Sequence, residues 1–337
     1  MAISVIISNF NGAKYLPRLL ETLKAQREVE LQIIVVDRHS TDESHAILSE
    51  HPDVLVVAEP PESGLVSGYD TGSLHAIHPN LFFCNEDMWF DPDCLAQLES
   101  LMDVKNRVWA VDPWQWTYDG SVWIHGGTRY QKTSGFLPNS AHPFRLNKFC
   151  EHLKRGELVA FGCAGAILMN RDVYRSLGGW DRSFFLDRED LDIFIRAWRA
   201  GWKCVSAPEA KVYHAVNVSN AKSIENGRLN VGKRRYISGC SSQLITSIKY
   251  FPAHWVAYHL MIYLIWSCYH LCSLRIKQFT WEILAVREFA MRFPQAWKYR
   301  KDTCEIRRLK PGQTFFYEPA FQVGADCCQE SPAGNGK

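Results

Sequence analysis

The sequence predicts an α/β fold: a doubly wound, mostly parallel sheet with helices on both faces. Short apolar runs rich in Val and Ile recur through the first half of the chain, as in strands that are buried on both faces of a parallel sheet. Segments with apolar residues at helical spacing lie between these runs. Strand and helix patterns therefore alternate, which is typical of a doubly wound sheet whose ligands bind at the carboxyl ends of the strands.

Each element has its own signal. Apolar runs predict strands at 3–7, 31–36, 54–57, 81–84 and 159–168. A first helix has a leucine stripe with Pro17 in its first turn, and Ser40-Thr41-Asp42 opens a second helix in capping fashion. A glycine-interrupted loop, 64–76, enters a third helix, Pro92 begins a fourth, and 171–177 is a short fifth.

Between residues 109 and 143 the sequence is rich in aromatic residues, Gly and Pro and shows little periodicity, so we expect irregular structure there. Aromatic side chains in such a segment either stack on sugar rings or form local core. Both interpretations stay open for Trp114, Trp116, Trp123 and Tyr130.

The stretch 178–214 contains an amphipathic helix that begins with a cluster of acids. Apolar residues recur at helical spacing from Leu191 to Trp198, and Gly201 is placed to end the helix. Carboxylates in a first turn are favoured by the helix dipole, so ordinary capping is one interpretation. The acids are more numerous than a cap needs and follow Phe184-Phe185, which favours the other, a catalytic acid or base beside an apolar wall. These acids are Asp187, Glu189, Asp190 and Asp192.

Polar residues also follow two of the predicted strands. Asn9, Asn11 and Asp37 lie just beyond the first two, where a nucleotide base and ribose could be bound, although each residue type is also common in turns. Asn85-Glu86-Asp87 follows the fourth, where oxygen ligands for Mg²⁺ or Mn²⁺ are expected; an acidic turn before a helix is the alternative.

Composition limits the class of protein. The formal charge of +2 over 337 residues argues against a nucleic-acid-binding protein. The 11 cysteines show no zinc-site spacing and read as reduced, mostly buried side chains, which predicts a cytoplasmic protein. Met1 leads directly into a strand pattern, so we expect no secretory signal.

Four segments together resemble one family in consistent order over residues 3–219: ISVIISNFNGAKYL, IIVVDRHSTDES, FFCNEDMWFDPDCL and the long segment from GCAGAILMN to KVYH. They are similar to the family 2 inverting glycosyltransferases of GT-A fold, in particular to a bacterial rhamnosyltransferase-like branch. The resemblance implies transfer of a sugar from a UDP-, dTDP- or GDP-sugar to a saccharide or lipid-linked glycan in bacterial surface polysaccharide biosynthesis, with a divalent cation (Mg²⁺ or Mn²⁺).

The resemblance also implies roles for individual residues. Asp190 would be the general base, with Glu189 as the other acid of the pair, and Asp87 and His214 would hold the metal. Two departures are Asn85 at the first position of the acidic triplet and Gly239-Cys240 where relatives commonly have Arg-Asn. The implied nucleotide-sugar-binding residues are Asn9, Asn11, Asp37, Gly68, Asp70, Asn85 and Asp87. The implied acceptor-binding residues are Gly165, Trp180 and Asp181.

Two other functions remain open at this level. A sugar nucleotidyltransferase would need a Gly-rich, basic phosphate loop after the first strand, and SNFNGAKYL has only Lys14 there. A catalytically inactive scaffold or binding subunit is the other alternative, motivated by Asn85 and Gly239-Cys240.

The C-terminal third is basic, aromatic and apolar. Residues 250–274 contain no Asp, Glu, Lys or Arg and fit three structures: a helix on an anionic membrane surface, a helix buried against the catalytic domain, or a membrane span. The first places the protein peripherally on the inner face of the cytoplasmic membrane. We expect a catalytic domain at 1–220, a helical region at 221–328 and a disordered tail at 329–337.

Overall fold

The computed structural model describes residues 2–60, 64–126, 153–185, 187–215, 224–225, 228–229, 232–251 and 253–302. The strands are β1 (Ala2–Asn9), β2 (Glu30–Asp37), β3 (Val54–Ala58), β4 (Asn80–Asn85), β5 (Met88–Phe90), β6 (Val108–Thr117), β7 (Trp123–His125), β8 (Leu158–Val159), β9 (Ala166–Asn170), β10 (Lys203–His214), β11 (Ile224–Glu225) and β12 (Arg228–Leu229). The helices are α1 (Leu16–Lys24), α2 (Ser44–Ser49), α3 (Leu65–Leu74), α4 (Cys94–Glu99), α5 (Arg171–Ser176), α6 (Glu189–Arg199), α8 (Lys233–Tyr250), α9 (Ala253–Cys272) and α10 (Ile276–Asp302), with a 3-10 turn at Val104–Asn106.

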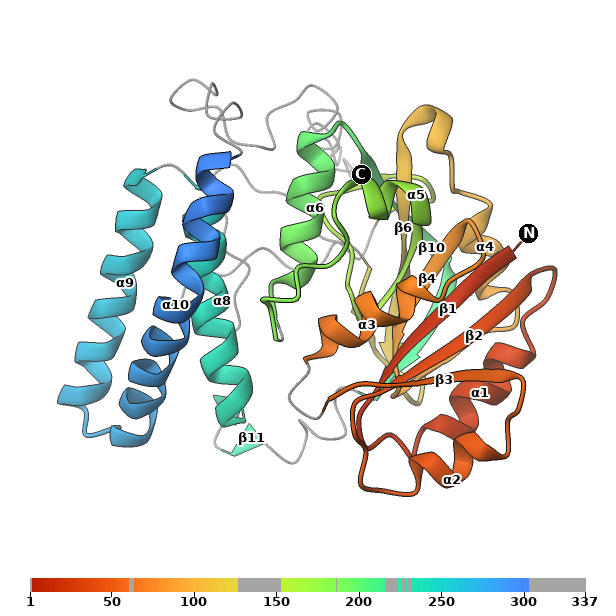
Figure 1. Cartoon of the computed structure of the whole chain (residues 1–337), viewed down its shortest axis with the longest axis horizontal. Coiled ribbons are helices and arrows are strands. Elements are labelled where there is room, and N and C mark those ends of the chain that lie inside the picture. Colours follow the sequence, from red (N-terminus) through yellow and green to blue (C-terminus); the bar gives the residue numbers. More distant parts are fainter. Residues whose placement is uncertain are drawn as a thin grey trace, which may run out of the picture.

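One mixed sheet organises the molecule, with strand order β3-β2-β1-β4-β9-β6-β10-β5 (Figure 1). The first four strands of the chain run parallel, as do β6 and β10, whereas β9 joins β4 to β6 in antiparallel fashion. The predicted α/β fold with helices on both faces is confirmed. The parallel half brings the carboxyl ends of β1, β2 and β4 to one edge, where such sheets bind ligands.

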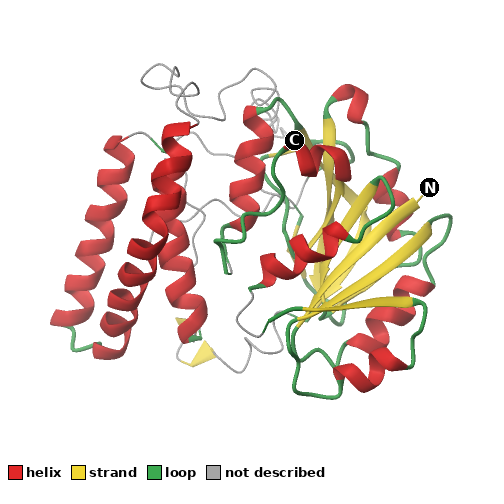
Figure 2. Ribbon diagram, in the orientation of Figure 1, coloured by secondary structure: helices red, strands yellow, loops and turns green. Residues whose placement is uncertain are grey.

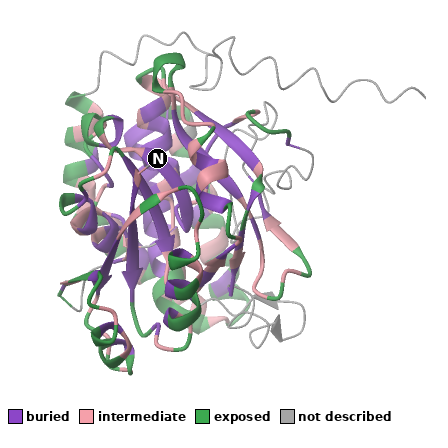
Figure 3. Cartoon of the chain, turned by 90° about the vertical axis from the view of Figure 1, so that its right-hand side faces the viewer, coloured by how far each residue is buried: buried purple, intermediate pink, exposed green. Residues whose placement is uncertain are grey.

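Two apolar cores lie on opposite faces of the sheet. Alternate residues of β1 divide between them: Ile6 packs with α3, α5 and α6, whereas Val5 and Ile7 pack with α1 and α4. Figure 2 shows the helices on both sides of the strands, and Figure 3 shows that the strands are buried over most of their length. Burial on both faces explains why these strands read as continuous apolar runs.

The structure corrects three local predictions. Residues 109–117 of the segment expected to be irregular belong to β6, a long strand inside the sheet, in which Trp109 is fully buried and Trp114 packs edge-on to Trp123; residues 127–143 lie outside the described residues. Trp109 and Trp114 therefore contribute to the core. The stretch 64–76 is largely helix α3 rather than a loop that precedes one. The helix expected after Ser40-Thr41-Asp42 begins only at Ser44, where Asp42 accepts hydrogen bonds from both the backbone N and Oγ of Ser44.

The three C-terminal helices stand side by side, with α8 between the rest of the bundle and the part of the molecule that contains the sheet (Figure 1). Ile245, Ile248 and Tyr250 of α8 belong to the same core as the residues under α3 and α6. By contrast, α9 packs on α8 and α10 and exposes much of its apolar surface. No helix in the described part of the chain, α9 included, has the length and apolarity needed to cross a membrane.

Some predictions lie outside the described residues: the predicted tail at 329–337, the side chain of Tyr130 and the chain around the predicted boundary at residue 220. The division into a catalytic domain and a helical region therefore remains a proposal. The buried cysteines expected at 84, 204 and 240 are free and buried, and Cys163 is partly buried.

Candidate active site

Strand register brings the predicted donor-side residues to one edge of the sheet. Asn9 lies opposite Asp37 in the β1–β2 ladder, and Ser8 lies opposite Asn85 in the β1–β4 ladder. Asn9, Asp37 and Asn85 are each the last residue of their strand, because polar side chains begin where the apolar runs end. The sequence prediction of a shared edge is confirmed.

Ser40 ties the first two loops at this edge together. Its hydroxyl donates to Asp37 Oδ1 (2.6 Å) and accepts from Asn9 Nδ2 (3.1 Å) and from the Asn11 backbone N (2.9 Å). Asn9 Nδ2 also donates to Asp37 Oδ1 at 2.7 Å. Asn11, whose φ is 54°, accepts a hydrogen bond from the Thr41 backbone N at 2.8 Å. Asp37 is only 1% exposed, so its carboxylate fixes the two loops that form this side of the site.

Two further charged residues lie at this edge: Arg38, which the sequence analysis did not single out, and Glu86, the middle residue of the predicted acidic triplet. Burial lowers the pKa of the Arg38 guanidinium, and the opposing charge of Glu86 raises it. Burial raises the pKa of Glu86 to about 7, with the adjacent Asp87 adding to the increase. Arg38 directly follows Asp37, so its place after the strand was the available signal.

Asn85 connects the donor edge to the turn before β9. Its backbone N donates to Gly165 O at 2.9 Å, and its Oδ1 accepts a hydrogen bond from the buried Tyr69 hydroxyl at 2.7 Å. A Cβ atom on Gly165 would lie 3.3 Å from Asn85 Nδ2, so the position has little room for a side chain. The predicted donor residue Asn85 and the predicted acceptor residue Gly165 are therefore direct neighbours.

Asp87 and His214 also meet, as the resemblance implied. His214 ends β10, which pairs with β5, and its Nε2 lies 3.1 Å from Asp87 Oδ1. His214 Nδ1 lies 3.2 Å from Gln115 Oε1, a contact that favours the proton on Nδ1 and leaves the Nε2 lone pair facing the carboxylate. Asp87 Oδ1 is buried without a hydrogen-bond partner.

A divalent cation fits this pair, because it would satisfy both lone pairs and is commonly held by one or two protein ligands plus substrate phosphates. Among the described residues there is no group of three or more His, Cys, Asp or Glu side chains arranged for a metal ion.

The two candidate bases at the start of α6 differ in their environment. Asp190 is partly exposed and accepts a hydrogen bond from the Leu191 backbone N at 2.7 Å; burial raises its pKa to about 6. Glu189 is 7% exposed, and burial followed by the charge of Asp190 raises its pKa well above the usual range. With a pKa of about 6, Asp190 is mostly ionised at neutral pH, whereas burial and the charge of Asp190 favour the protonated form of Glu189, so Asp190 is the better candidate for the base.

Asp112, His125 and Cys163 are further polar residues near Asp190 that sequence reasoning missed. Asp112 of β6 is fully buried, accepts from the Cys163 backbone N at 2.9 Å and lies 3.4 Å from His125 Nε2. A protonated His125 would lower the pKa of Asp190, and Asp190 helps to raise the pKa of Cys163, after burial, to about 12. The Cys163 thiol therefore stays protonated and contributes no charge near Asp190.

Two predicted donor-binding residues of α3 have structural contacts. A Cβ atom on Gly68 would lie 2.3 Å from Ser8 Oγ, so the close approach that this glycine permits is between α3 and β1. Asp70 pairs with Arg182 (2.6 Å) and accepts from the Tyr174 hydroxyl (3.0 Å). Binding of donor by either residue remains a prediction.

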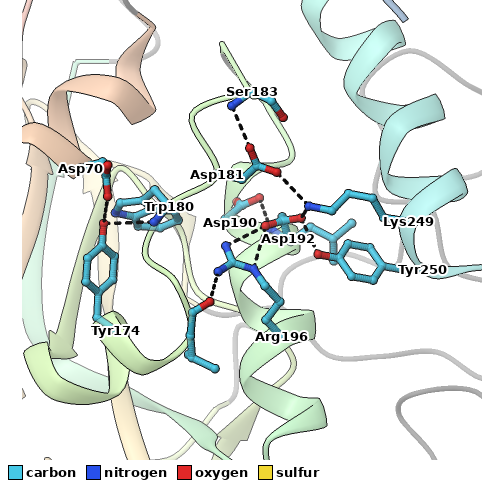
Figure 4. A network of polar contacts seen from close by, with 12 residues as sticks. Asp70, Tyr174, Trp180, Asp181, Ser183, Asp190, Asp192, Arg196, Lys249 and Tyr250 are labelled. Carbon is cyan, nitrogen blue, oxygen red and sulfur yellow. Dashed lines mark hydrogen bonds and ion pairs between the residues drawn. The ribbon is translucent and has the colours of Figure 1, made fainter. Parts of the chain in front are cut away.

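The predicted acceptor residues Trp180 and Asp181 lie between α5 and α6 (Figure 4). Trp180 is 2% exposed and its ring packs against Tyr69, Phe83 and Tyr174, so its ring is core and offers no open stacking surface for a sugar. Asp181 keeps a partly exposed carboxylate. Of this pair, Asp181 remains the better candidate for contact with an acceptor.

Comparison with known proteins places this chain in one family. Residues 4–178 match the model of glycosyl transferase family 2, and the chain belongs to that family. It is 25% identical over 240 residues to the N-acetylglucosaminyl-diphospho-decaprenol L-rhamnosyltransferase of two Mycobacterium tuberculosis strains, covering 62% of this chain and 75% of the relative. An uncharacterized glycosyltransferase of Nostoc sp. is 29% identical over 112 residues, covering 32% of this chain and 35% of the relative.

Solved structures agree on the fold. A crystal structure of GalNAc-T7 with UDP, GalNAc and Mn²⁺ superposes with a TM-score of 0.53 at 16% identity, covering 74% of this chain. The chain spans about half of that structure's length (48%). The predicted GT-A fold and glycosyltransferase family are both confirmed.

Proposed function

We propose that this chain is a metal-dependent inverting glycosyltransferase that moves a sugar from a nucleotide sugar to a hydroxyl group of a saccharide or lipid-linked glycan. The observation that carries the proposal is Asp190, an ionisable carboxylate with a pKa of about 6 in a family 2 glycosyltransferase. A carboxylate with a pKa just below 7 is mostly ionised at pH 7 and is still basic enough to accept a proton.

On the donor side, Asn9, Asn11 and Asp37 form a rigid edge for the nucleoside, with Asn85 beside them. Asp87 and His214 would hold a Mg²⁺ or Mn²⁺ ion. When bound, such an ion offsets the charge that develops on the departing nucleoside diphosphate.

On the acceptor side, Asp190 takes the proton of the acceptor hydroxyl as its oxygen bonds to the anomeric carbon. The bond from that carbon to the diphosphate oxygen breaks in the same step, and the nucleoside diphosphate leaves with the electron pair. One displacement inverts the anomeric configuration. Asp181 and the backbone near Gly165 would orient the acceptor.

The relative that acts on a decaprenyl-diphosphate-linked sugar supports a lipid-linked acceptor and an L-rhamnose donor as the first candidates, in bacterial surface polysaccharide biosynthesis. The exposed apolar surface of α9 supports a site of action at an anionic membrane surface, on its cytoplasmic side.

The test is turnover of a donor panel. Purified protein is incubated with UDP-, dTDP- and GDP-sugars, including an L-rhamnose donor, and release of nucleoside diphosphate is measured with Mn²⁺, with Mg²⁺ and with a chelator. We expect metal-dependent turnover of one donor, lost on chelation and weakened by Asp87→Ala through donor binding.

Two outcomes would contradict the proposal. Nucleotide binding without any turnover would favour an inactive binding subunit. Formation of a nucleotide sugar and pyrophosphate from a sugar 1-phosphate and a nucleoside triphosphate would favour a nucleotidyltransferase.

A further inference from the structure

The loop between α5 and α6 is held by ion pairs from two different parts of the molecule. We call residues 178–185 the junction loop. Arg182 Nε lies 2.6 Å from Asp70 Oδ2 of α3, within the catalytic part. Its neighbour Asp181 lies 2.9 Å from Lys249 Nζ, at the end of α8 (Figure 4). One side of the junction loop is thus fixed by the donor-side helix and the other by the C-terminal bundle.

The same lysine also holds the helix that carries the proposed base. Lys249 donates to Asp192 Oδ1, and Tyr250 donates to the same oxygen at 2.5 Å. Arg196 binds the other oxygen, Oδ2, through two nitrogens at 2.7 and 3.0 Å. Asp192 is fully buried and lies in the same first turn of α6 as Asp190, two residues away. Fixing Asp192 therefore fixes the start of α6.

Burial makes these contacts costly to lose. The Lys249 side chain is 3% exposed, and a buried charge is tolerated only when it is paired. In Figure 4, the ammonium group of Lys249 contacts both Asp181 and Asp192. Its partners lie 68 and 57 residues earlier in the chain. Lys249 itself lies beyond the segment matched by the family model, which ends at residue 178.

We propose that Lys249 is a positioning residue for sugar transfer: it locks the junction loop and the start of α6 in register, so that Asp181 and Asp190 present one acceptor site. The inference rests on the proposed function of Asp190. The C-terminal bundle then helps to position the acceptor site in addition to stabilising the fold. Small displacements suffice, because a misplacement of about 1 Å can cost about 10²-fold in rate.

The test removes the Lys249–Asp192 pair and checks separately that each variant is folded. Lys249→Met alone leaves Asp192 paired with Arg196 and takes one cation from Asp181, and we expect a lower Tm and weaker transfer. Lys249→Met/Asp192→Asn also takes the carboxylate partner from Arg196, so its Tm should stay below that of wild type, and transfer is measured at a temperature at which circular dichroism shows the variant to be folded. Transfer by the double variant should stay reduced by about 10²-fold, while its Kd for UDP, dTDP or GDP, measured calorimetrically with Mn²⁺, stays within about twofold of wild type. Lys298→Met, at an exposed lysine of α10, is the matched control and should change none of these values.

Hydrogen exchange supplies a readout that does not depend on activity. The Ser183 backbone N donates to Asp181 Oδ1 at 2.8 Å, and the Phe184 N donates to Asp181 O at 3.0 Å. We expect peptides that cover 181–191 to exchange faster in the double variant and unchanged in Lys298→Met.

A double variant that transfers sugar at the wild-type rate, or whose 181–191 peptides exchange as in wild type, would overturn the inference. If wild-type protein turns over no donor, the proposed function fails, and the exchange experiment still decides whether Lys249 holds the loop.

Discussion

At the scale of single residues, the adjacent acids Glu189 and Asp190 show how burial assigns different roles to similar groups. Both pKa values are raised by burial, but that of Asp190 reaches only about 6. Its partial exposure and its hydrogen bond from the Leu191 N both favour the charged form. The charge that the proposed proton transfer needs at Asp190 is therefore kept at neutral pH, at some cost in stability.

Asp190→Asn should separate catalysis from stability. The folded protein binds a proton at Asp190 more tightly than the unfolded chain does, so the stability that this proton supplies is present at low pH and is lost as pH rises through about 6. At pH 8 the variant should therefore be more stable than wild type, by about 1–3 kcal/mol, with a higher Tm by calorimetry. Transfer should fall by about 10² to 10⁴-fold with nucleotide binding unchanged.

Glu189→Gln is the matched control for this prediction. Since burial and the charge of Asp190 raise the pKa of Glu189 well above its usual range and so favour its protonated form, Glu189→Gln should support far more transfer than Asp190→Asn does. Transfer that survives Asp190→Asn but not Glu189→Gln would assign the base to Glu189 instead.

At the scale of elements, α3 lies unusually close to β1. Gly68 and Gly72 of α3 face Ser8 and Ile6, and a Cβ atom at these glycines would lie 2.3 Å from Ser8 Oγ and 2.4 Å from Ile6 Cγ2. Because α3 also carries Asp70, this packing sets the position of the Arg182 end of the junction loop. The glycines of this stretch therefore serve helix–sheet contact.

Gly68→Ala should consequently destabilise the protein by about 1–3 kcal/mol, the usual cost of an extra carbon in a packed core, despite the better helix propensity of Ala. The free energy of unfolding in urea measures it. Leu74→Ala on the same helix is the control: Leu74 is 69% exposed, and we expect a change within about 0.5 kcal/mol. Equal stability of Gly68→Ala and wild type would mean that α3 can move away from β1 without cost.

Whether a strand could be predicted from the sequence depended on how far along the chain the hydrogen-bond partners of its polar side chains lie. The strands β1, β2 and β4 were predictable because burial on both faces requires apolar runs, and their polar ends marked the donor edge. The strand β6 was not, because Asp112 and Trp114 inside it are satisfied by Cys163 and Ser206, 51 and 92 residues away. The role of Lys249 was not predictable for the same reason, because its partners Asp181 and Asp192 lie 68 and 57 residues away.

At the scale of the whole molecule, the C-terminal bundle has buried polar groups beside a small apolar core, and a partly apolar exterior. Glu282 is 3% exposed and pairs with His270 at 2.7 Å and with the Tyr236 hydroxyl at 3.0 Å, so these groups tie α8, α9 and α10 together. The outward residues of α9 include Leu264 (63% exposed) and Ile265 (55%). An apolar exterior beside the exposed basic residues Lys277 and Arg287 is typical of a helix that lies on an anionic membrane surface.

We therefore expect the protein to sediment with vesicles that contain phosphatidylglycerol more than with vesicles of phosphatidylcholine alone, and salt to weaken the difference. Leu264→Glu/Ile265→Glu should reduce sedimentation with both, because it removes the apolar contact and adds negative charge. Leu74→Glu/Ile77→Glu is the matched control, since these residues are equally exposed (69% and 67%) but lie on the catalytic part. If both double variants lose vesicle binding equally, the effect is one of net charge and α9 is not the contact surface. If only the α9 variant loses vesicle binding, α9 is the contact surface. If Lys249 also positions the junction loop, then α8 connects the membrane-bound helices to α6, which carries Asp190. A lipid-linked acceptor would then reach the proposed site at the membrane surface that anchors it.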